Sequence, residues 1–325
     1  MADEQIEKKP LNRELLQTRL VLIAFILVSL TSVIVLGLAN LNSGSLVAIK
    51  AKANTATSSP VQTAVFPHQV VLAQAVVVYD INNQKVLFAK NADTVLPLAS
   101  LTKLMTVLVT AEQIPLKTLV TIPDLNFNLE SFNPNLIAGE KWHLKDLIDF
   151  TLVSSSNDGA RALALVTMAK TQNPEINFVT AMNNRRQSLG LTDLRFYNET
   201  GLDESPNLAG AYGSALAISK LNAYLVTKYP ELIEATNKKL IYPKISGYQI
   251  HPALNTNPII GNLPGLLSSK TGYTLLAGGN LSIVFQAGLN RPIAITVLGS
   301  SLEGRFSDTE KLVWATLDYL AQEEK

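Results

Sequence analysis

Three short strings in this chain combine residue types that can transfer an acyl group. They are, in order, Ser100-Leu101-Thr102-Lys103, Ser155-Ser156-Asn157 and Lys270-Thr271-Gly272. A serine hydroxyl attacks a carbonyl well only when a neighbouring base takes its proton. A lysine three residues further along a helix lies on the same face, and burial lowers its pKa so that it can be that base. Apolar residues flank Lys103, so we predict that Ser100 is a nucleophile and Lys103 its buried base.

The second and third strings supply groups that a peptide substrate needs. Ser155 is predicted to pass on a proton, and the Asn157 side-chain amide to bond to the substrate backbone. The segment LLSSKTGYT around Lys270 is predicted to be an edge strand, to which an extended peptide can add by main-chain hydrogen bonds. The Lys270 ammonium and the Thr271 hydroxyl would then meet a terminal carboxylate. Gly272 would let the two backbones come close.

Each string taken alone also has an ordinary structural interpretation. The first could be the polar side of an amphipathic helix, the second a helix cap, and the third a surface turn with an exposed lysine. Ser-x-x-Lys is expected by chance about once in a chain of this length, and a second Ser-x-Asn occurs at 205–207. The functional hypothesis therefore depends on the order, spacing and flanking sequence of the strings.

The surrounding pattern predicts an antiparallel sheet with a largely helical insertion. β-Branched and aromatic runs at 74–80 and 85–89, and again at 280–287 and 292–298, predict two hairpins. Apolar residues at helical spacing predict a helix through 101–109 and others at 144–150, 159–170, 176–189, 214–225 and 309–321. Strands at both ends of a helical middle indicate an α/β (α+β) fold whose sheet is covered by terminal helices. The site would lie where sheet and insertion meet.

Composition narrows the class of protein. The chain has 325 residues with 27 Lys+Arg against 26 Asp+Glu, and no basic stripe stands out, so nucleic acid is not expected as a partner. There are no cysteines, hence no disulfides and no thiolate chemistry. His68, His143 and His251 lie far apart without metal-ligand spacing, so we expect neither a metal nor a cofactor.

The amino-terminal part of the chain predicts a membrane anchor. Residues 20–39 carry no charge and would span about 30 Å as a single transmembrane helix. Basic residues precede this segment and the next one is Lys50, so the positive-inside rule predicts a cytoplasmic tail at 1–19 and export of the remainder. A cleaved signal peptide ending at 37–39 is the alternative, although the long apolar run favours an anchor. Residues 40–69 predict a flexible linker to a catalytic domain at 70–325.

The strings and their flanks resemble one family, the low-molecular-weight penicillin-binding proteins that act as D-alanyl-D-alanine carboxypeptidases. The resemblance runs from about residue 74 to residue 317. It includes LFAKNADTVLPLASLTKLMT, GEKWHLKDLIDFTLVSSSNDGARALA, FYNETGLD, and Asn255-Thr256-Asn257 ahead of KTGYT. It implies a β-lactamase/transpeptidase-like fold on the extracytoplasmic side of a bacterial cytoplasmic membrane.

The resemblance also implies a mechanism and partners. Ser100 would attack the carbonyl between the terminal D-alanines of a peptidoglycan stem peptide, and Lys103 would take its proton. Ser155 would pass a proton to the departing D-alanine with electrostatic support from Lys270. The backbone N–H groups of Ser100 and Tyr273 would form the oxyanion hole. Water would release the acyl-enzyme, whereas a β-lactam would be trapped on it.

Two positions depart from the family pattern, and other activities remain open. Ala217 stands where the family usually has an acid, and Ser268 stands where it usually has glycine. Neither change touches the nucleophile, base or relay, so we expect activity. A DD-endopeptidase would use the same residues, and a non-catalytic peptidoglycan-binding protein is the alternative from another class. A class A β-lactamase is disfavoured, because no convincing Glu-x-x-Leu-Asn string lies between the second and third strings.

Overall fold

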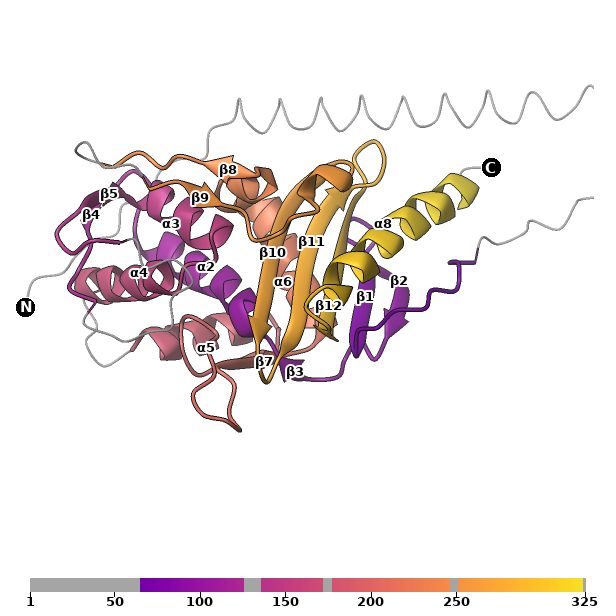
Figure 1. The fold of residues 1–325 in the computed structure, drawn as a ribbon, viewed down its shortest axis with the longest axis horizontal. Coiled ribbons are helices and arrows are strands. Elements are labelled where there is room, and N and C mark those ends of the chain that lie inside the picture. The colour runs from indigo at the N-terminus through magenta and orange to yellow at the C-terminus, as the bar shows by residue number, and fades with distance from the viewer. Residues whose placement is uncertain (1–64, 126–135, 172–176, 246–250, 324–325) are drawn as a thin grey trace, which may run out of the picture. The chain divides into compact units, whose positions relative to one another are not determined.

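The computed structural model describes residues 65–125, 136–171, 177–245 and 251–323, which belong to one compact unit. Its centre is an antiparallel five-stranded sheet in the order β10-β11-β12-β1-β2 (Figure 1). The strands are β1 (Ala75–Asp80), β2 (Lys85–Lys90), β10 (Leu266–Thr274), β11 (Gly278–Gln286) and β12 (Pro292–Ser300). Both predicted hairpins are confirmed.

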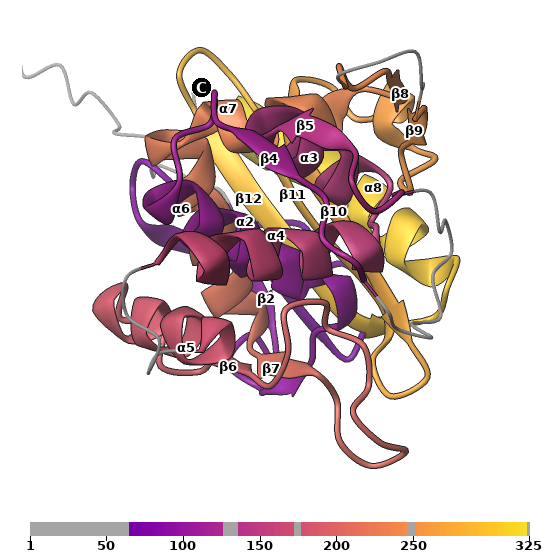
Figure 2. The same ribbon diagram turned by 90° about the vertical axis from the view of Figure 1, so that its left-hand side faces the viewer.

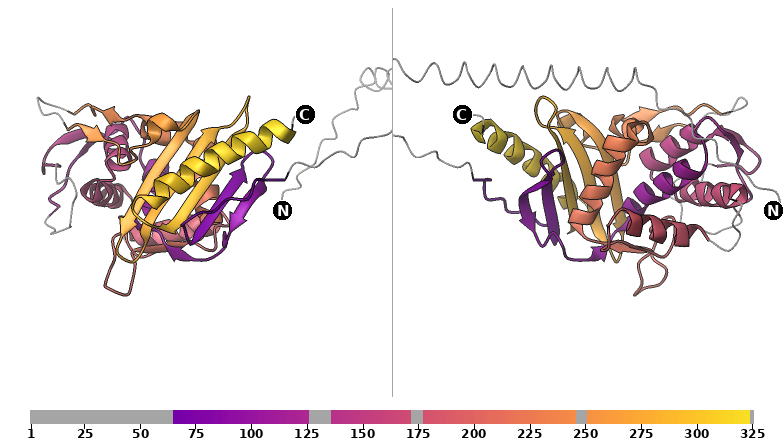
Figure 3. Two further views of the ribbon diagram at one scale, coloured as in Figure 1. Left: turned by 45° about the vertical axis from the view of Figure 1, so that its right-hand side comes forward. Right: turned by 180° about the vertical axis from the view of Figure 1, so that it is seen from behind.

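Both faces of the sheet are buried. Side chains alternate between the faces of a strand, and all six residues of β1 are buried. Val76 and Val78 pack in the core under α8 (Gly304–Glu323), whereas Ala75 and Val77 pack in the core shared with α6 (Ala215–Lys228). In the left view of Figure 3, α8 crosses the sheet as a yellow helix. The expectation that terminal helices cover the sheet is therefore half wrong, because α6 from the middle of the chain covers the second apolar face.

The helical part packs beside the sheet around a single apolar core (Figure 2). It contains the 3-10 helix η1 (Ala99–Thr102) and the helices α2 (Lys103–Gln113), α3 (Leu144–Val153), α4 (Asn157–Lys170), α5 (Phe178–Ser188) and α7 (Pro230–Ile233). Two further 3-10 helices are η2 (Glu234–Asn237) and η3 (Ile260–Asn262). Short strands complete it: β3 (Leu96–Pro97), β4 (Leu119–Thr121), β5 (Lys141–His143), β6 (Arg195–Phe196), β7 (Ala211–Gly213), β8 (Leu240–Ile241) and β9 (Ala253–Leu254).

The last helix is tied to the segment that leads into the first strand. The Asp308 carboxylate on α8 is completely buried and accepts hydrogen bonds from the backbone N–H groups of Leu72 (3.1 Å) and Ala73 (2.9 Å). Phe66, within the predicted linker, has its ring 5.3 Å from that of Phe88 and 5.4 Å from that of Tyr319. These contacts hold the start of the described chain against β2 and α8.

The predicted membrane anchor at 20–39 and the cytoplasmic tail at 1–19 lie outside the described residues, as does most of the linker at 40–69. Within the residues that the structure describes, none of the helices has the length and apolar character needed to span a bilayer.

Candidate active site

Ser100 and Lys103 lie side by side at the junction of η1 and α2. Lys103 Nζ donates hydrogen bonds to Ser100 Oγ (2.9 Å), to Asn157 Oδ1 (2.8 Å) and to the carbonyl oxygen of Thr200 (2.7 Å). The lysine side chain is fully buried, whereas Ser100 is partly exposed. A buried base in contact with an accessible hydroxyl is the arrangement that activates a serine for attack.

The environment of Lys103 lowers its pKa to about 7. Burial is the main cause, because it disfavours the charged ammonium, while the negative charge of Glu199 acts in the opposite direction and raises the pKa. A pKa near the working pH suits a group that must both accept and return a proton.

In the string Ser155-Ser156-Asn157, the middle residue caps a helix and the two outer residues contact the lysines of the site. The hydroxyl of Ser156 accepts a hydrogen bond from Gly159 N (2.9 Å) and caps α4. Asn157 is the first residue of that helix and accepts from Lys103. Ser155 has a positive φ of 58°, an uncommon conformation for a residue other than glycine. The alternative interpretation as a cap therefore applies to Ser156, and the predicted relay and amide residues face the lysines.

Lys270 joins the third string to the second. Its Nζ donates to Ser155 Oγ over 2.7 Å and to the carbonyl oxygen of Thr271 over 2.9 Å. Burial lowers the pKa of Lys270 well below its usual value, and the positive charges of Lys103 and Arg305 lower it further. All three strings thus meet at one place, with two buried lysines that each contact a serine hydroxyl.

The carboxyl-terminal half of β10 runs past Ser100. An ideal Cβ built on Gly272 would lie 3.2 Å from Ser100 N and 2.9 Å from the carbonyl oxygen of Leu98, so any side chain there would press on the turn that carries Ser100. Ser269 N donates to Thr236 Oγ1 (3.0 Å), which lies outside the sheet, so this N–H group points to the outer edge of β10. Because hydrogen-bonding direction alternates along an antiparallel strand, the N–H group of Tyr273 also faces the outer edge, beside Ser100.

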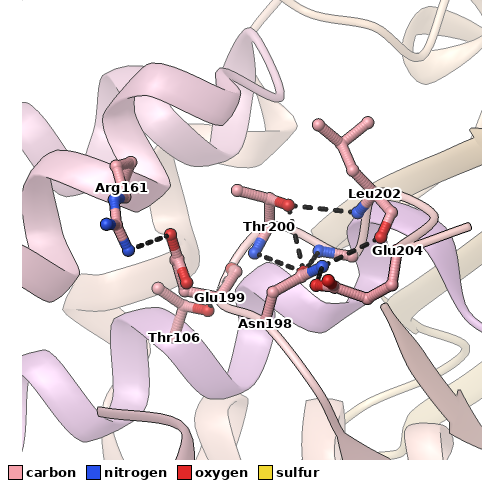
Figure 4. A network of polar contacts seen from close by, with 8 residues as sticks. Thr106, Arg161, Asn198, Glu199, Thr200, Leu202 and Glu204 are labelled. Carbon is pink, nitrogen blue, oxygen red and sulfur yellow. Dashed lines mark hydrogen bonds and ion pairs between the residues drawn. The ribbon is translucent and has the colours of Figure 1, made fainter. Parts of the chain in front are cut away.

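The loop at 198–202 completes the surroundings of Lys103. Figure 4 shows the polar contacts within this loop and the ion pair of Glu199 with Arg161. Asn198 Oδ1 accepts from the backbone N–H groups of Thr200 (3.1 Å) and Gly201 (2.7 Å), which shapes the turn and points the Thr200 carbonyl at Lys103. Glu199 is buried and pairs with Arg161 at 3.2 Å. The sequence resemblance includes this loop, but it assigned no role to Thr200 or Glu199.

Gly201 in that loop is placed where no other residue fits. Its φ is 82°, and a Cβ would collide with the carbonyl oxygen of Ala99 and lie 2.6 Å from Thr102 Oγ1. Only glycine adopts this conformation without strain. The loop can therefore lie directly against the turn that carries Ser100.

Arg305 is a site residue that sequence reasoning missed. Its Nη1 donates to the carbonyl oxygen of Gly272 over 2.7 Å, and burial lowers its pKa to about 10. Among the described residues its buried Nε has no hydrogen-bond partner. The residue comes from α8, and no motif marked it in advance.

The two departures from the family pattern lie away from the reacting groups. Ser268 is buried and donates to Asn222 Oδ1 on α6 (2.8 Å), so its side chain lies on the face of the sheet that α6 covers. Ala217 lies in the first turn of α6, where Ser214 accepts its N–H (3.1 Å) and donates to Asp193 (2.9 Å). Neither position crowds Ser100.

The described residues contain no group of three His, Asp or Glu side chains close enough to hold a metal ion. The chemistry that the site can perform is acyl transfer by a serine, with two buried lysines and nearby backbone N–H groups.

Comparison with known proteins places the chain in a family. The model of the D-alanyl-D-alanine carboxypeptidase family (peptidase family S11) matches residues 61–301. The chain is 28% identical over 246 residues to the D-alanyl-D-alanine carboxypeptidase DacF of Bacillus subtilis, covering 74% of this chain and 61% of that protein. It is 30% identical over 254 residues to a D-alanyl-D-alanine endopeptidase of Pseudomonas aeruginosa, covering 76% of this chain and 77% of the relative.

Solved structures agree with this assignment. Penicillin-binding protein D2 from Listeria monocytogenes, in its ampicillin-bound form, superposes with a TM-score of 0.65 at 27% identity, covering 77% of this chain and 98% of that one. The fold is therefore the mixed α/β fold of penicillin-binding proteins, with antiparallel sheets and helices. This chain belongs to the D-alanyl-D-alanine carboxypeptidase family.

Proposed function

We propose that this protein is a serine-type D-alanyl-D-alanine carboxypeptidase that trims peptidoglycan stem peptides. The observation that carries the proposal is the pairing of each buried lysine with a serine hydroxyl, Lys103 with Ser100 at 2.9 Å and Lys270 with Ser155 at 2.7 Å. A protein that only bound stem peptides would not need a lysine of lowered pKa against a partly exposed serine. This argues against the non-catalytic alternative.

The first half of the reaction follows from these contacts. Ser100 Oγ forms a bond to the carbonyl carbon between the two D-alanines, and its proton passes to Lys103. The oxyanion is held by the N–H groups of Ser100 and Tyr273, each such donor typically contributing about 10²–10³ in rate. The C–N bond then breaks, and the departing amine takes the proton of the Ser155 hydroxyl, which is replaced by the proton that Lys103 accepted, while Lys270 supports this relay electrostatically.

The second half releases the shortened peptide. Water attacks the ester carbonyl and gives its proton to Lys103, which passes it to Ser100 Oγ as the ester C–O bond breaks. A β-lactam acylates the same serine, because its strained amide stands in for the peptide bond. Arg305 and Lys270 place positive charge beside Thr271 and Gly272, where the carboxylate of either compound would be attracted.

A DD-endopeptidase is the second candidate, because one relative with that name is 30% identical to this chain. The chain also spans only 61% of the length of DacF. The two activities share the serine and both lysines, so the product distinguishes them. A carboxypeptidase releases free D-alanine, and an endopeptidase splits a cross-linked dimer.

The predicted location of the enzyme is part of the proposal. Residues 20–39 would anchor the chain in the bacterial cytoplasmic membrane, with 1–19 in the cytoplasm. Residues 40–69 would link this anchor to a catalytic domain at 70–325 on the extracytoplasmic side. The length of the uncharged run and the basic residues before it support this arrangement.

The proposal is tested by labelling the full-length chain with a fluorescent penicillin. The wild type should carry a covalent label, Ser100→Ala should carry none, and Ser205→Ala, in the second Ser-x-Asn string, should label like the wild type. Absence of label on the folded wild type would overturn the proposal and leave a peptidoglycan-binding role.

A further inference from the structure

Part of the outer edge of β10 is covered by other segments. Thr236 Oγ1 accepts a hydrogen bond from Ser269 N over 3.0 Å, and Asn257 Nδ2 donates to Ser269 Oγ over 2.9 Å. All three residues are at most 3% exposed. We call residues 234–237 and 255–257 the edge cover. The edge of β10 at Ser269 is thus already occupied, although β10 is the last strand of its sheet.

The edge cover is itself held together by hydrogen bonds. Asn255 Nδ2 donates to the carbonyl oxygens of Thr236 (2.8 Å) and Lys238 (3.0 Å), which joins its two segments. Asn237 Nδ2 donates to the carbonyl oxygen of Leu266 (3.3 Å) and extends the cover toward the start of the strand. The edge cover is therefore held in place by hydrogen bonds between its own segments and by hydrogen bonds to β10.

The cover ends beside the third string. Its contacts with the β10 backbone, among the described residues, stop at Ser269. Its next contact joins two side chains, Thr256 Oγ1 and Thr271 Oγ1, at 2.6 Å. Ser269 and Thr271 are two residues apart, which corresponds to about 7 Å along a strand. A peptide paired with Thr271 and Tyr273 therefore meets the cover after about one further residue.

Charges decide which end of a peptide lies toward the cover. On the side of the cover, Lys270 Nζ donates to the Thr271 carbonyl oxygen over 2.9 Å. At the opposite end of the strand Asp203 accepts from Thr274 Oγ1 (2.9 Å). A terminal carboxylate is attracted by the Lys270 ammonium and repelled by Asp203. The carboxyl end of the substrate therefore points toward the cover.

We propose that the edge cover closes the leaving-group side of the site after a single residue. The chain then releases one carboxyl-terminal residue with a free carboxylate and rejects leaving groups that continue further. A longer leaving group has no carboxylate next to Lys270 and runs into Thr236 and Asn257, whose polar groups are already bonded to Ser269. This inference rests on the proposed function and selects the carboxypeptidase over the endopeptidase.

The first test uses the wild-type, full-length chain and two purified substrates. One is a monomeric muropeptide ending in D-alanyl-D-alanine, and the other is a cross-linked dimer in which the leaving amine belongs to a second stem peptide. The value of kcat/KM should be at least about tenfold lower for the dimer, a discrimination within reach of a closed subsite. A smaller difference would overturn the inference.

Substitutions at Thr236 test whether the cover is responsible. Thr236→Ala removes both the acceptor and the methyl group, which frees Ser269 N–H and opens space for a longer leaving group. Thr236→Ser keeps the hydroxyl. The ratio of dimer to monomer cleavage should rise severalfold in Thr236→Ala and stay at the wild-type value in Thr236→Ser. Equal ratios in these two variants would contradict the assignment, and the wild-type comparison decides if the alanine variant does not fold.

Penicillin labelling of the same samples separates this inference from the proposed function. Labelled protein that cleaves monomer and dimer equally well overturns the edge cover as a determinant and leaves the acyl-enzyme intact. Folded protein without label overturns the proposed function itself.

Discussion

Lys103 and Lys270 are two almost completely buried lysines (0% and 1% exposed), and the charge of Lys103 acts on Lys270 within one site. Each donates a hydrogen bond to the hydroxyl of a serine, Ser100 or Ser155. Burial lowers the pKa of both, and the charge of Lys103 further lowers that of Lys270. Because burial lowers the pKa of Lys103 to about 7, its neutral form is available near neutral pH to serve as the proposed base for Ser100.

The pH dependence of acylation should report this base. Because the pKa of Lys103 is lowered to about 7, the neutral form is scarce below this pH and dominant above it. The rate of acylation by a penicillin should rise from pH 5 to pH 9 with a midpoint near 7, measured by stopped-flow fluorescence on folded protein. A rate that does not change across this range would contradict the role of Lys103 as the base.

Glu199→Gln should shift that midpoint to lower pH. The negative charge of Glu199 raises the pKa of Lys103, and glutamine removes the charge while keeping the side-chain length and the backbone carbonyl that accepts from Thr106 (2.7 Å). The same stopped-flow titration measures the effect. A midpoint that stays in place or moves upward would show that Glu199 does not act on the base through its charge.

Gly201→Ala should impair acylation more than a glycine substitution elsewhere. The new Cβ would collide with the carbonyl oxygen of Ala99 and displace the turn that carries Ser100. Misplacing reacting groups by about 1 Å can cost about 100-fold in rate. Gly139→Ala is the matched control, because Gly139 also has a positive φ (88°) but nothing lies within 4 Å of its Cβ position. Equal acylation rates in the two variants would refute the steric explanation.

Ser268→Ala should destabilise the fold without touching a reacting group. It removes the donor to Asn222 Oδ1, a fully buried acceptor, and an unsatisfied buried group costs about 1–3 kcal/mol. Thermal unfolding would show this as a lower Tm. Ser205→Ala, at an exposed position, should change stability by less than about 0.5 kcal/mol. A Tm for Ser268→Ala equal to that of Ser205→Ala would mean that the buried hydrogen bond contributes nothing.

Local pattern was enough to predict most elements but not all their ends. The helix predicted at 309–321 begins at Gly304, because Ser301 Oγ accepts a hydrogen bond from Gly304 N (2.8 Å) and caps this end. The helix predicted from Gly159 begins at Asn157, because Ser156 is its cap. Such starts depend on side-chain hydrogen bonds that spacing alone does not reveal.

The predicted site residues could be identified from the sequence because each string is short and local. Residues of the site that lie outside the three strings matched no motif. Arg305 lies on the terminal helix, and Thr200 contributes a backbone carbonyl that any residue type could supply. The predicted edge strand is confirmed as the last strand of its sheet, but Thr236 and Asn257 cover part of it. The contacts of Thr236 and Asn257 with Ser269 depend on tertiary packing, which cannot be predicted from the type of each residue alone.

The position of β1 between β2 and β12 has a consequence for how the chain reaches its native state. Val77 pairs with Thr296. The second edge of β1, which is synthesised early, therefore forms its backbone hydrogen bonds only after β12, near the end of the chain, has been synthesised. Contacts of such long sequence separation slow folding, because the loop must close before they form. During synthesis, β1 therefore emerges with apolar side chains and with backbone N–H and C=O groups that are still unpaired along one edge. The hairpin to β2 protects one side of it until the end of the chain arrives.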